Sequence, residues 1–525
     1  MENLLDKQLN EIEQEVKQES GGVAGGRKPS AAKLLIELVE EDDSIELFHN
    51  DIKDVFARIF VEGHYEIWKI RSKQFKQWLV KQFWELHDKA PSTNALNEAL
   101  NVIESKARFN GEQHTLANRV TRGIDGVLWY DLTNDGWKAV RITTAGWEVV
   151  EHPPILFRRY QHQAAQVEPT RGGDVKSILK YVNISQPGQQ LLFLVYMLSC
   201  FIPGFPHPIP IVYGVQGSAK SSLSKVLRAI VDPSAIEVSE LPKNHAELVQ
   251  KLAHHWCIIF DNISYVSDEV SDLLCRAATG TGFSKRELYT DDEDVILVLK
   301  HCVALNGINL MATRPDLLER SILFVLERIT KDRRKLEQEL FAELRQELPS
   351  ILGGVFDVLS RALQIHPSVK LAEYPRMADF ARWGCAISEA MGYTHDDFLK
   401  AYYTNIASQN EEVINENVVA AALLDFMDGR TEWDGTPKDL YETVRDVAQK
   451  NFGIRENDKQ FPRATNAFSR QLNRLQPTLE EEGLKVHHEK GRQRRIFIQN
   501  QKVSENTADT AESPQDNDLA GLINF

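Results

Sequence analysis

Residues 209–227, IPIVYGVQGSAKSSLSKVL, have the types and order of a phosphate-binding loop between a strand and a helix. In the usual pattern, G-x-x-x-x-G-K-[ST], backbone N–H groups wrap the phosphates, the lysine supplies charge and the hydroxyl binds magnesium. Ala219 stands where the second glycine is expected. We expect Ala219 at the helix entry in a right-handed conformation, where alanine costs little. The predicted nucleotide-binding residues are Gly214, Gly217, Ser218, Ala219, Lys220, Ser221 and Ser222.

Polar side chains follow the later apolar runs at matching positions. Asp261 follows the apolar residues of WCIIFDN, 41 residues after Lys220 (261 − 220), and Asn306 follows those of HCVALNG. An apolar strand that ends in aspartate has the form of a Walker B element, which holds magnesium. Ligands bind at the carboxyl ends of such strands. The sequence therefore predicts ATP and Mg²⁺ as cofactors, with Ser221 and Asp261 at the metal, rather than a fortuitous glycine-rich turn.

The segment LLCRAATGTGFSKRELYTDDEDVILVLKHCVALNGINLMATRPDLLERSILFVLERI resembles AAA+ ATPases. More narrowly, it is similar to superfamily 3 helicases and to the primase–helicase proteins of phages, plasmids and poxviruses. The resemblance implies that Asn306 polarises the attacking water or the γ-phosphate. It also implies that Arg320 reaches the ATP of a neighbouring subunit in a homo-oligomeric ring, expected to be a hexamer, with Arg314 as the second candidate. The alternative for either arginine is an ion pair with Asp316 or Glu319.

Two departures from the family pattern affect the expected chemistry. Many AAA+ proteins have a glutamate base after the Walker B aspartate, but this chain has Asn262, which leaves Asp268 or Glu269 as substitutes. The family's pore hairpin often carries a basic tip, whereas the apparent turn here is TDDED, with Lys285 and Arg286 only at its base. DNA contact by this hairpin is left open.

A second candidate site lies in the basic stretch from Lys459 to Arg495, which holds nine Lys or Arg and four Glu in a chain of net charge −15. An acidic chain needs such a local concentration to bind nucleic acid. A helix followed by a basic hairpin resembles a winged helix, whose recognition helix enters the major groove. The alternative is a solvated face that pairs with the chain's own acids. The predicted DNA-binding residues are Lys285, Arg286, Arg463, Arg470, Arg474, Lys490, Arg492, Arg494 and Arg495.

The elements that must position these residues belong to a globular chain of ordinary composition. Of its 525 residues, 42% are hydrophobic and 26% are charged. The five cysteines form no C-x-x-C pair, which fits a reducing, cytoplasmic setting. The N-terminus is too charged for a signal peptide, and LLFLVYMLSCFI (191–202) is too short to cross a bilayer, so we expect a buried helix there and no membrane partner.

The expected fold class is α/β, with a AAA+ P-loop ATPase core between additional domains. Apolar runs PIPIVYG, AIEVSEL, WCIIFDN and CVALNGI alternate with helical stretches, a pattern typical of a parallel sheet covered by helices. The expected parts are a flexible segment (1–30), a mixed α+β domain of unknown role (31–185), the ATPase core (186–330), a helical domain (331–430), a winged-helix-like domain (431–499) and a disordered acidic tail (500–525).

Three functions fit this organisation. The first is an ATP-dependent helicase or translocase that replicates the DNA of a phage, plasmid or integrated element. The second is a regulatory or defence ATPase in which nucleotide controls assembly on DNA without unwinding, which Asn262 and the acidic hairpin tip favour. The third is a small-molecule P-loop kinase, which the basic C-terminal region disfavours. No primase constellation is evident, so if priming is needed, we expect a separate protein to supply it.

Overall fold

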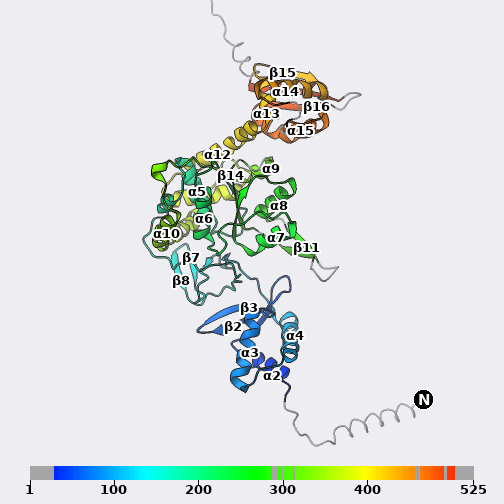
Figure 1. Ribbon diagram of the computed structural model, residues 1–525. Helices are drawn as coiled ribbons and strands as arrows, with labels where there is room; N and C mark the ends of the chain where they lie inside the picture. The colour runs from blue at the N-terminus through cyan, green and yellow to red at the C-terminus, as the bar shows by residue number, and fades with distance from the viewer. Residues whose placement is uncertain are drawn as a thin grey trace, which may run out of the picture. The chain divides into compact units, whose positions relative to one another are not determined.

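The computed structural model describes residues 29–502, except 281, 287–293, 298–299, 309, 311–313, 456–457, 459–460 and 490–493. The expectations for residues 1–28 and 503–525 lie outside this range. The chain divides into two compact units between Leu116 and Ala117 (Figure 1). The mixed domain expected over 31–185 is therefore split, because its second half packs with the unit that holds the phosphate loop.

In its described part, residues 29–116, the first unit packs three helices on a four-stranded sheet. The sheet has the order β3-β2-β1-β4, in which β4 is parallel to β1 and the other pairs are antiparallel. Alternate residues of β2, Val55, Ala57 and Ile59, are buried in the same core as the helices. The elements are α2 (Ala31–Glu40), β1 (Glu46–His49), β2 (Val55–Val61), β3 (His64–Lys69), α3 (Lys73–His87), α4 (Thr93–Phe109) and β4 (Glu112–Gln113).

The second unit begins with an antiparallel meander of four strands. The predicted runs GVLWYDL, WKAVRIT and GWEVVEH form its last three strands. A 3-10 helix, η1, then leads to the apolar helix α5, in which residues 191–199 are all buried as expected. These elements are β5 (Val120–Arg122), β6 (Leu128–Asp131), β7 (Ala139–Thr143), β8 (Gly146–Val150), η1 (Val175–Tyr181) and α5 (Pro187–Ser199).

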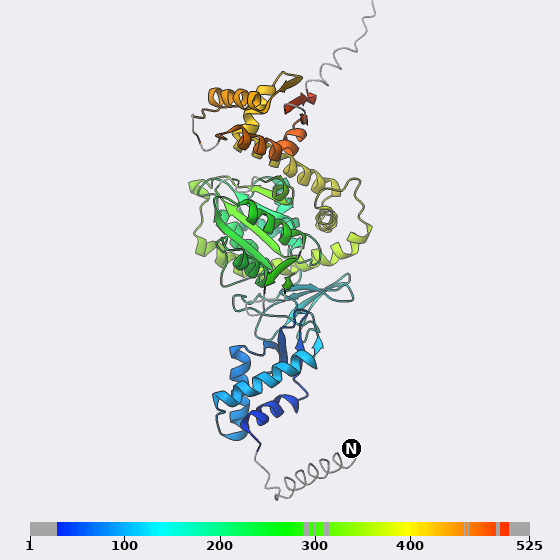
Figure 2. The same ribbon diagram turned by 90° about the vertical axis from the view of Figure 1, so that its right-hand side faces the viewer.

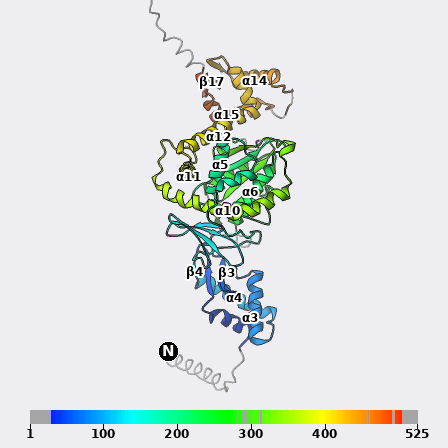
Figure 3. The same ribbon diagram turned by 90° about the vertical axis from the view of Figure 1, so that its left-hand side faces the viewer.

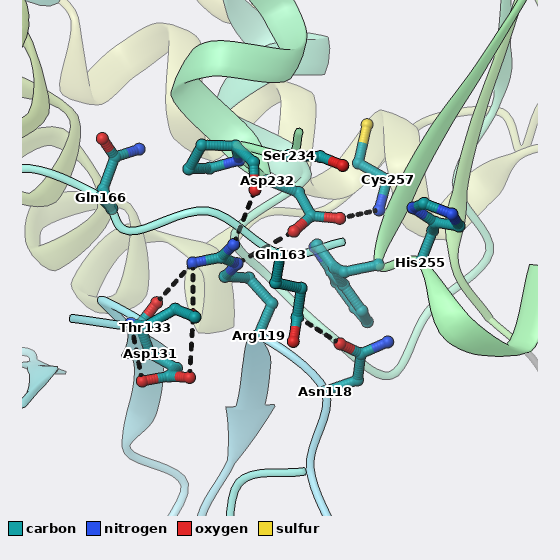
Figure 4. A network of polar contacts seen from close by, with 12 residues as sticks. Asn118, Arg119, Asp131, Thr133, Gln163, Gln166, Asp232, Ser234, His255 and Cys257 are labelled. Carbon is teal, nitrogen blue, oxygen red and sulfur yellow. Dashed lines mark hydrogen bonds and ion pairs between the residues drawn. The ribbon is translucent and has the colours of Figure 1, made fainter. Parts of the chain in front are cut away.

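Arg119 ties this meander to the rest of the unit (Figure 4). Its side chain is fully buried, and Nε donates to Asp232 Oδ1 at 2.9 Å. Nη1 donates to Thr133 Oγ1 and Asp131 O, and Nη2 donates to the carbonyls of Ala164 and Pro233. All five guanidinium N–H groups therefore have an acceptor, which a buried charge requires.

The centre of the second unit is a parallel sheet of order β10-β13-β9-β14 (Figure 2). Its two faces bury different residues, because side chains alternate along each strand. One face packs with α5 and α6, and the other packs with α7 and α8. The elements are β9 (Ile209–Tyr213), α6 (Lys220–Val231), α7 (His245–His254), β10 (Cys257–Ile263), α8 (Asp268–Thr279), β13 (Cys302–Gly307), α9 (Pro315–Leu318) and β14 (Ser321–Val325).

One strand expected in this sheet is not formed, whereas the hairpin expected between β10 and β13 is present. The run AIEVSEL forms no full strand, since only Ser239 makes a parallel bridge, to Phe260 of β10. The expected hairpin is present as backbone in β11 (Phe283–Arg286) and β12 (Asp294–Leu297), which pair antiparallel. Its TDDED turn lies almost entirely outside the described residues.

A helical region follows the sheet, as the sequence predicts for 331–430. The 29-residue α10 packs against α11 and against the meander. It is the one described helix long and apolar enough to cross a membrane, but 61% of its most apolar window is buried inside the protein. The elements, some of which Figure 3 labels, are η2 (Lys331–Arg333), α10 (Glu337–Ile365), η3 (His366–Ser368), α11 (Ala378–Ala390), α12 (His395–Glu416) and α13 (Val418–Met427).

The chain described up to residue 502 ends with two helices and three short strands. The predicted hairpin is present, and a strand that the sequence did not reveal, β15, pairs with its second arm to give the order β15-β17-β16. The elements are β15 (Glu432–Gly435), α14 (Pro437–Asn451), α15 (Thr465–Glu481), β16 (Leu484–Glu489) and β17 (Arg495–Asn500).

Candidate nucleotide-binding site

The loop between β9 and α6 needs glycine at two points. Gly214 has φ 146°, and a Cβ there would lie 2.2 Å from the carbonyl oxygen of Leu326. Gly217 has φ 83°, in the left-handed region that side chains disfavour. The loop therefore follows its tight path only with glycine at both positions.

Ala219 does not adopt the right-handed conformation that the sequence analysis assigned to it. It caps α6 with φ 61° and ψ 33°, which is left-handed, and its side chain provides no capping hydrogen bond. A non-glycine residue in this region costs about 1–2 kcal/mol, because Cβ crowds the following carbonyl oxygen. The turn from the loop into the helix thus demands a positive φ, and alanine occupies the position at an energetic cost.

The two residues after Ala219 lie at the mouth of the loop. Lys220 Nζ donates to the carbonyl oxygens of Gly214 and Val215, at 2.8 and 3.1 Å. Burial lowers the pKa of Lys220, and the Asp261 carboxylate partly offsets this decrease. The Ser221 hydroxyl donates to Asp261 Oδ2 at 3.0 Å. A hydroxyl and a carboxylate at one point form an oxygen pair suited to Mg²⁺, which also takes ligands from phosphates and water.

Asn262 follows Asp261 at an irregular point of β10. The pairing register with β13 shifts between Phe260 and Ile263, and Asn262 has φ 55°. Its backbone N–H donates to Asp261 Oδ1 at 2.7 Å, which orients the carboxylate. Asparagine tolerates this conformation better than most residues.

The two substitutes for a catalytic base are engaged elsewhere on α8. Asp268 Oδ2 lies 3.2 Å from Arg474 Nη2, and Glu269 Oε2 lies 3.6 Å from His245 Nε2. Neither lines the cavity at the phosphate loop. The structure therefore does not bring Asp268 or Glu269 together with Lys220.

Asn306 reaches the site from β13, the strand between β9 and β10. Its side chain is 1% exposed, and Nδ2 donates to Ser224 Oγ of α6 at 3.3 Å. Oδ1 has no hydrogen-bond partner among the described residues. Buried polar atoms are nearly always paired, so this oxygen is suited to a water molecule or a ligand.

These residues surround one cavity of about 410 Å³. Its size is within the range of small-molecule sites, about 300–1,000 Å³. All seven loop residues that the sequence predicted, except Gly214, line it together with Asp261 and Asn306. The full lining is Gln216, Gly217, Ser218, Ala219, Lys220, Ser221, Ser222, Asp261, Asn262, Asn306, Gly307 and Ile308.

The two candidate arginines lie away from this cavity. Ser321, the first residue of β14, pairs with Ile209, the first residue of β9. Arg320 directly precedes Ser321, so it lies at the amino-terminal ends of these strands, whereas the phosphate loop follows the carboxyl end of β9. A strand of five residues, such as β9, is roughly 15 Å long, so its two ends are separated by that distance. Arg320 is 9% exposed and pairs with Asp316, as the ion-pair alternative proposed, while its Nε has no partner among the described residues. Arg314 pairs with Asp272 at 2.7 Å.

Sequence reasoning missed two polar residues near these groups. Asn183 Nδ2 donates to the carbonyl oxygens of Ser218 and Glu327, at 3.1 and 2.7 Å, and so joins the phosphate loop to the chain after β14. Arg376 lies 3.5 Å from Asp316 and, with Arg320, lines a second cavity of about 230 Å³. Neither residue belongs to a motif, so the sequence offers no signal for them.

The predicted DNA-binding residues divide into three groups. Arg463, Arg470 and Arg494 are exposed. Arg474 pairs with Asp268, and Arg495 forms a two-point ion pair with Asp434 at 2.5 and 3.0 Å, as the alternative of internal pairing proposed. The others are not placed: Lys490 and Arg492 lie outside the described residues, and Lys285 and Arg286 are described only as backbone of β11.

Two parts of this chain match known protein families. Residues 175–411 match the family described as actinomycete integrative conjugative element replication protein, and residues 419–513 match the family described as the AICE RepA C-terminal domain. These two matches support a replication protein of a mobile element. They agree with the replication role expected from the sequence, whereas ATP hydrolysis, the AAA+ class and the ring remain predictions.

The other comparisons add little. A search of curated proteins found no match. Solved structures of the NrS-1 C-terminal region cover 90% of this chain and 99–100% of their own length, at 12–13% identity and TM-scores of 0.37–0.39. Scores this low carry no argument about fold or function.

Proposed function

We propose that this chain is a Mg²⁺-dependent, AAA+-type ATPase that acts on DNA during replication of a mobile element, as a helicase or translocase. One observation carries the proposal. Lys220 and Ser221 of α6, Asp261 of β10 and Asn306 of β13 meet around one cavity at the carboxyl ends of adjacent parallel strands. This is where ligands bind in open α/β sheets.

Each residue has a role that its position supports. Lys220 exchanges its contacts with two loop carbonyls for phosphate oxygens, and the N-terminus of α6 adds favourable electrostatics. Ser221 and Asp261 hold the magnesium ion, which neutralises phosphate charge when it is bound. Asn306 Oδ1, which is buried and unpaired among the described residues, accepts a hydrogen bond from the attacking water and orients it.

Arg320 acts in a different subunit from the nucleotide it contacts. Arg320 and the phosphate loop of its own chain lie at opposite ends of the strands, so Arg320 would have to reach ATP bound by a neighbour. Its Nε, which has no partner within the described part of the chain, and its place on a cavity with Arg376 support an interaction with an incoming anion. This proposal requires a homo-oligomer, for which a closed ring is the expected form.

The C-terminal region supplies the DNA contact. The succession of α13, β15, α14, α15 and the hairpin β16–β17 supports a winged-helix-like reading with α15 as the recognition helix. Arg463, Arg470 and Arg494 are exposed there and form no ion pair within the described part of the chain. They are the cations best placed to contact DNA phosphates.

A regulatory ATPase is the second candidate, and Asn262 favours it. Asparagine cannot take a proton from water, and neither Asp268 nor Glu269 lines the cavity. If nucleotide only controls assembly, turnover with DNA should stay well below the common enzyme median of roughly 10 per second. Fast, DNA-stimulated turnover would reject this candidate in favour of the helicase.

The nucleotide site is tested by Lys220→Ala. Removing the charge should abolish Mg-ATP binding and hydrolysis while the thermal unfolding midpoint without nucleotide stays unchanged. Lys243→Ala, which removes an exposed lysine elsewhere in the same unit, is the matched control and should behave as the wild type. Equal ATP binding by both variants would reject the assignment of the site.

A further inference from the structure

The chain that leaves β14 passes directly over the phosphate loop. Leu326 N donates to Tyr213 O at 2.9 Å, and Ile329 N donates to Gly217 O at 3.2 Å. Asn183 bridges the two segments by donating to both Ser218 O and Glu327 O. The segment after β14 is therefore fixed to the middle of the loop.

The same segment is also fixed at its other end. Glu337, the first residue of α10, accepts from Lys225 Nζ at 2.6 Å. Lys225 lies on α6, the helix that follows the phosphate loop, and also pairs with Glu237 at 3.2 Å. The segment between Ile329 and Glu337 is thus attached at both of its ends, to the phosphate loop and to α6.

We name residues 328–335, RITKDRRK, the basic strap. It has five Lys or Arg and one Asp, a local excess of cations in a chain of net charge −15. Lys335 pairs with Glu343 at 2.8 Å. Arg328, Lys331 and Arg334 have no carboxylate within ion-pair distance among the described residues. Such an excess of cations in a tethered segment favours an anionic ligand.

Arg334 of the strap reaches the middle of the phosphate loop. Its Nη2 lies 3.8 Å from the point where a Cβ of Gly217 would be. Its backbone is extended, with φ −74° and ψ 128°, between η2 and α10. The glycine at 217 thus leaves open the space that the guanidinium faces.

We propose that Arg334 binds the phosphates of a nucleoside triphosphate held by the phosphate loop of its own chain. This inference rests on the proposed function and adds a residue to that site. Arginine suits the role because its planar fork donates two parallel hydrogen bonds to phosphate and stays charged at any working pH. Arg334 acts in cis, whereas Arg320 lies at the other end of the strands and acts in trans.

The test compares the affinity for a fluorescent ATP analogue, with Mg²⁺, of the full-length wild type, Arg334→Ala and Arg334→Lys. Loss of a charge-assisted contact should raise the Kd of Arg334→Ala by roughly tenfold. Arg334→Lys should recover part of the affinity. Lys335→Ala is the matched control, since it removes an adjacent charge that already pairs with Glu343, and its Kd should be unchanged.

The outcomes separate this inference from the proposed function. If the wild type binds ATP, Lys220→Ala does not, and Arg334→Ala binds as tightly as Lys335→Ala, only the role of Arg334 is rejected. If Arg334→Ala keeps its ATP affinity but loses affinity for single-stranded DNA, the strap serves nucleic acid, which also overturns the inference. If the wild type binds no ATP, both proposals fall.

Discussion

At the scale of single residues, the site departs from the usual pattern at two positions with positive φ. Ala219 and Asn262 both adopt the left-handed conformation, and both line the cavity. Strain of this kind persists only where the surrounding structure imposes it, and it often occurs at functional sites. We therefore expect a substitution at either position to change the stability of the fold and the function of the site to different degrees.

Ala219→Gly should stabilise the protein by about 1 kcal/mol, because glycine adopts φ 61° without a steric cost. Chemical denaturation should show a higher midpoint, and nucleotide affinity should be retained. The control is Ala229→Gly, the same exchange ten residues on within α6, where helical φ makes glycine destabilising by about 1 kcal/mol. A shift of the same sign in both variants would contradict the conformation of Ala219.

The spacing of Lys220, Ser221, Asp261 and Asn306 was enough to predict that these four residues meet at one cavity. The local pattern could not indicate the positive φ of Ala219, because the path of the loop into α6 imposes it. Asn183, Arg334 and Arg376 could not be predicted either. Each reaches its neighbours through contacts between segments far apart in sequence, which no periodicity or motif encodes.

At the scale of elements, a buried polar network joins the meander, α6 and β10. Burial alone would raise the pKa of Asp232, but Arg228 and Arg119 lower it well below its usual range. Arg228 Nη2 donates to His255 Nδ1 at 2.7 Å, and the rings of His162 and His255 lie 3.8 Å apart. The neutral form of His255 is therefore the one that fits.

Stability should consequently fall as the pH is lowered from 7 to 5. Burial, with Arg228 next in importance, lowers the pKa of His255 to about 3, while the unfolded chain titrates near 6.5. The unfolded state takes up the proton first, so stability is complete above about pH 6.5 and decreases below it. His255 alone should account for about 2 kcal/mol between pH 7 and pH 5.

His255→Asn isolates this contribution, because the amide oxygen can replace Nδ1 as acceptor but does not titrate. Urea unfolding at pH 7 and pH 5 should show a smaller loss of stability for His255→Asn than for the wild type. His487→Asn, at an exposed position of β16, should leave the pH dependence unchanged. Identical pH dependence in all three proteins would show that His255 does not stay neutral in the fold.

At the scale of the whole molecule, the proposed DNA binding and the proposed ATP hydrolysis use different parts of the second unit. Replacing Arg470 and Arg494 together by alanine should weaken duplex binding and flatten the slope of log affinity against log salt by roughly 0.9 for each lost phosphate contact. Lys438→Ala on α14 is the control, and basal ATPase activity should survive in both. An unchanged salt slope in the double variant would reject the winged-helix-like surface.

The phosphate loop and Arg320 also lie at opposite ends of the strands of one sheet, so the proposed ATPase site should need two subunits. The central claim is tested most directly by steady-state ATP hydrolysis in mixtures of Lys220→Ala and Arg320→Ala proteins. Each variant alone should be inactive. Mixing them should restore part of the activity, because some interfaces then combine an intact phosphate loop with an intact Arg320. Wild-type hydrolysis by Lys220→Ala alone, or no recovery at any ratio in confirmed mixed oligomers, would contradict the account.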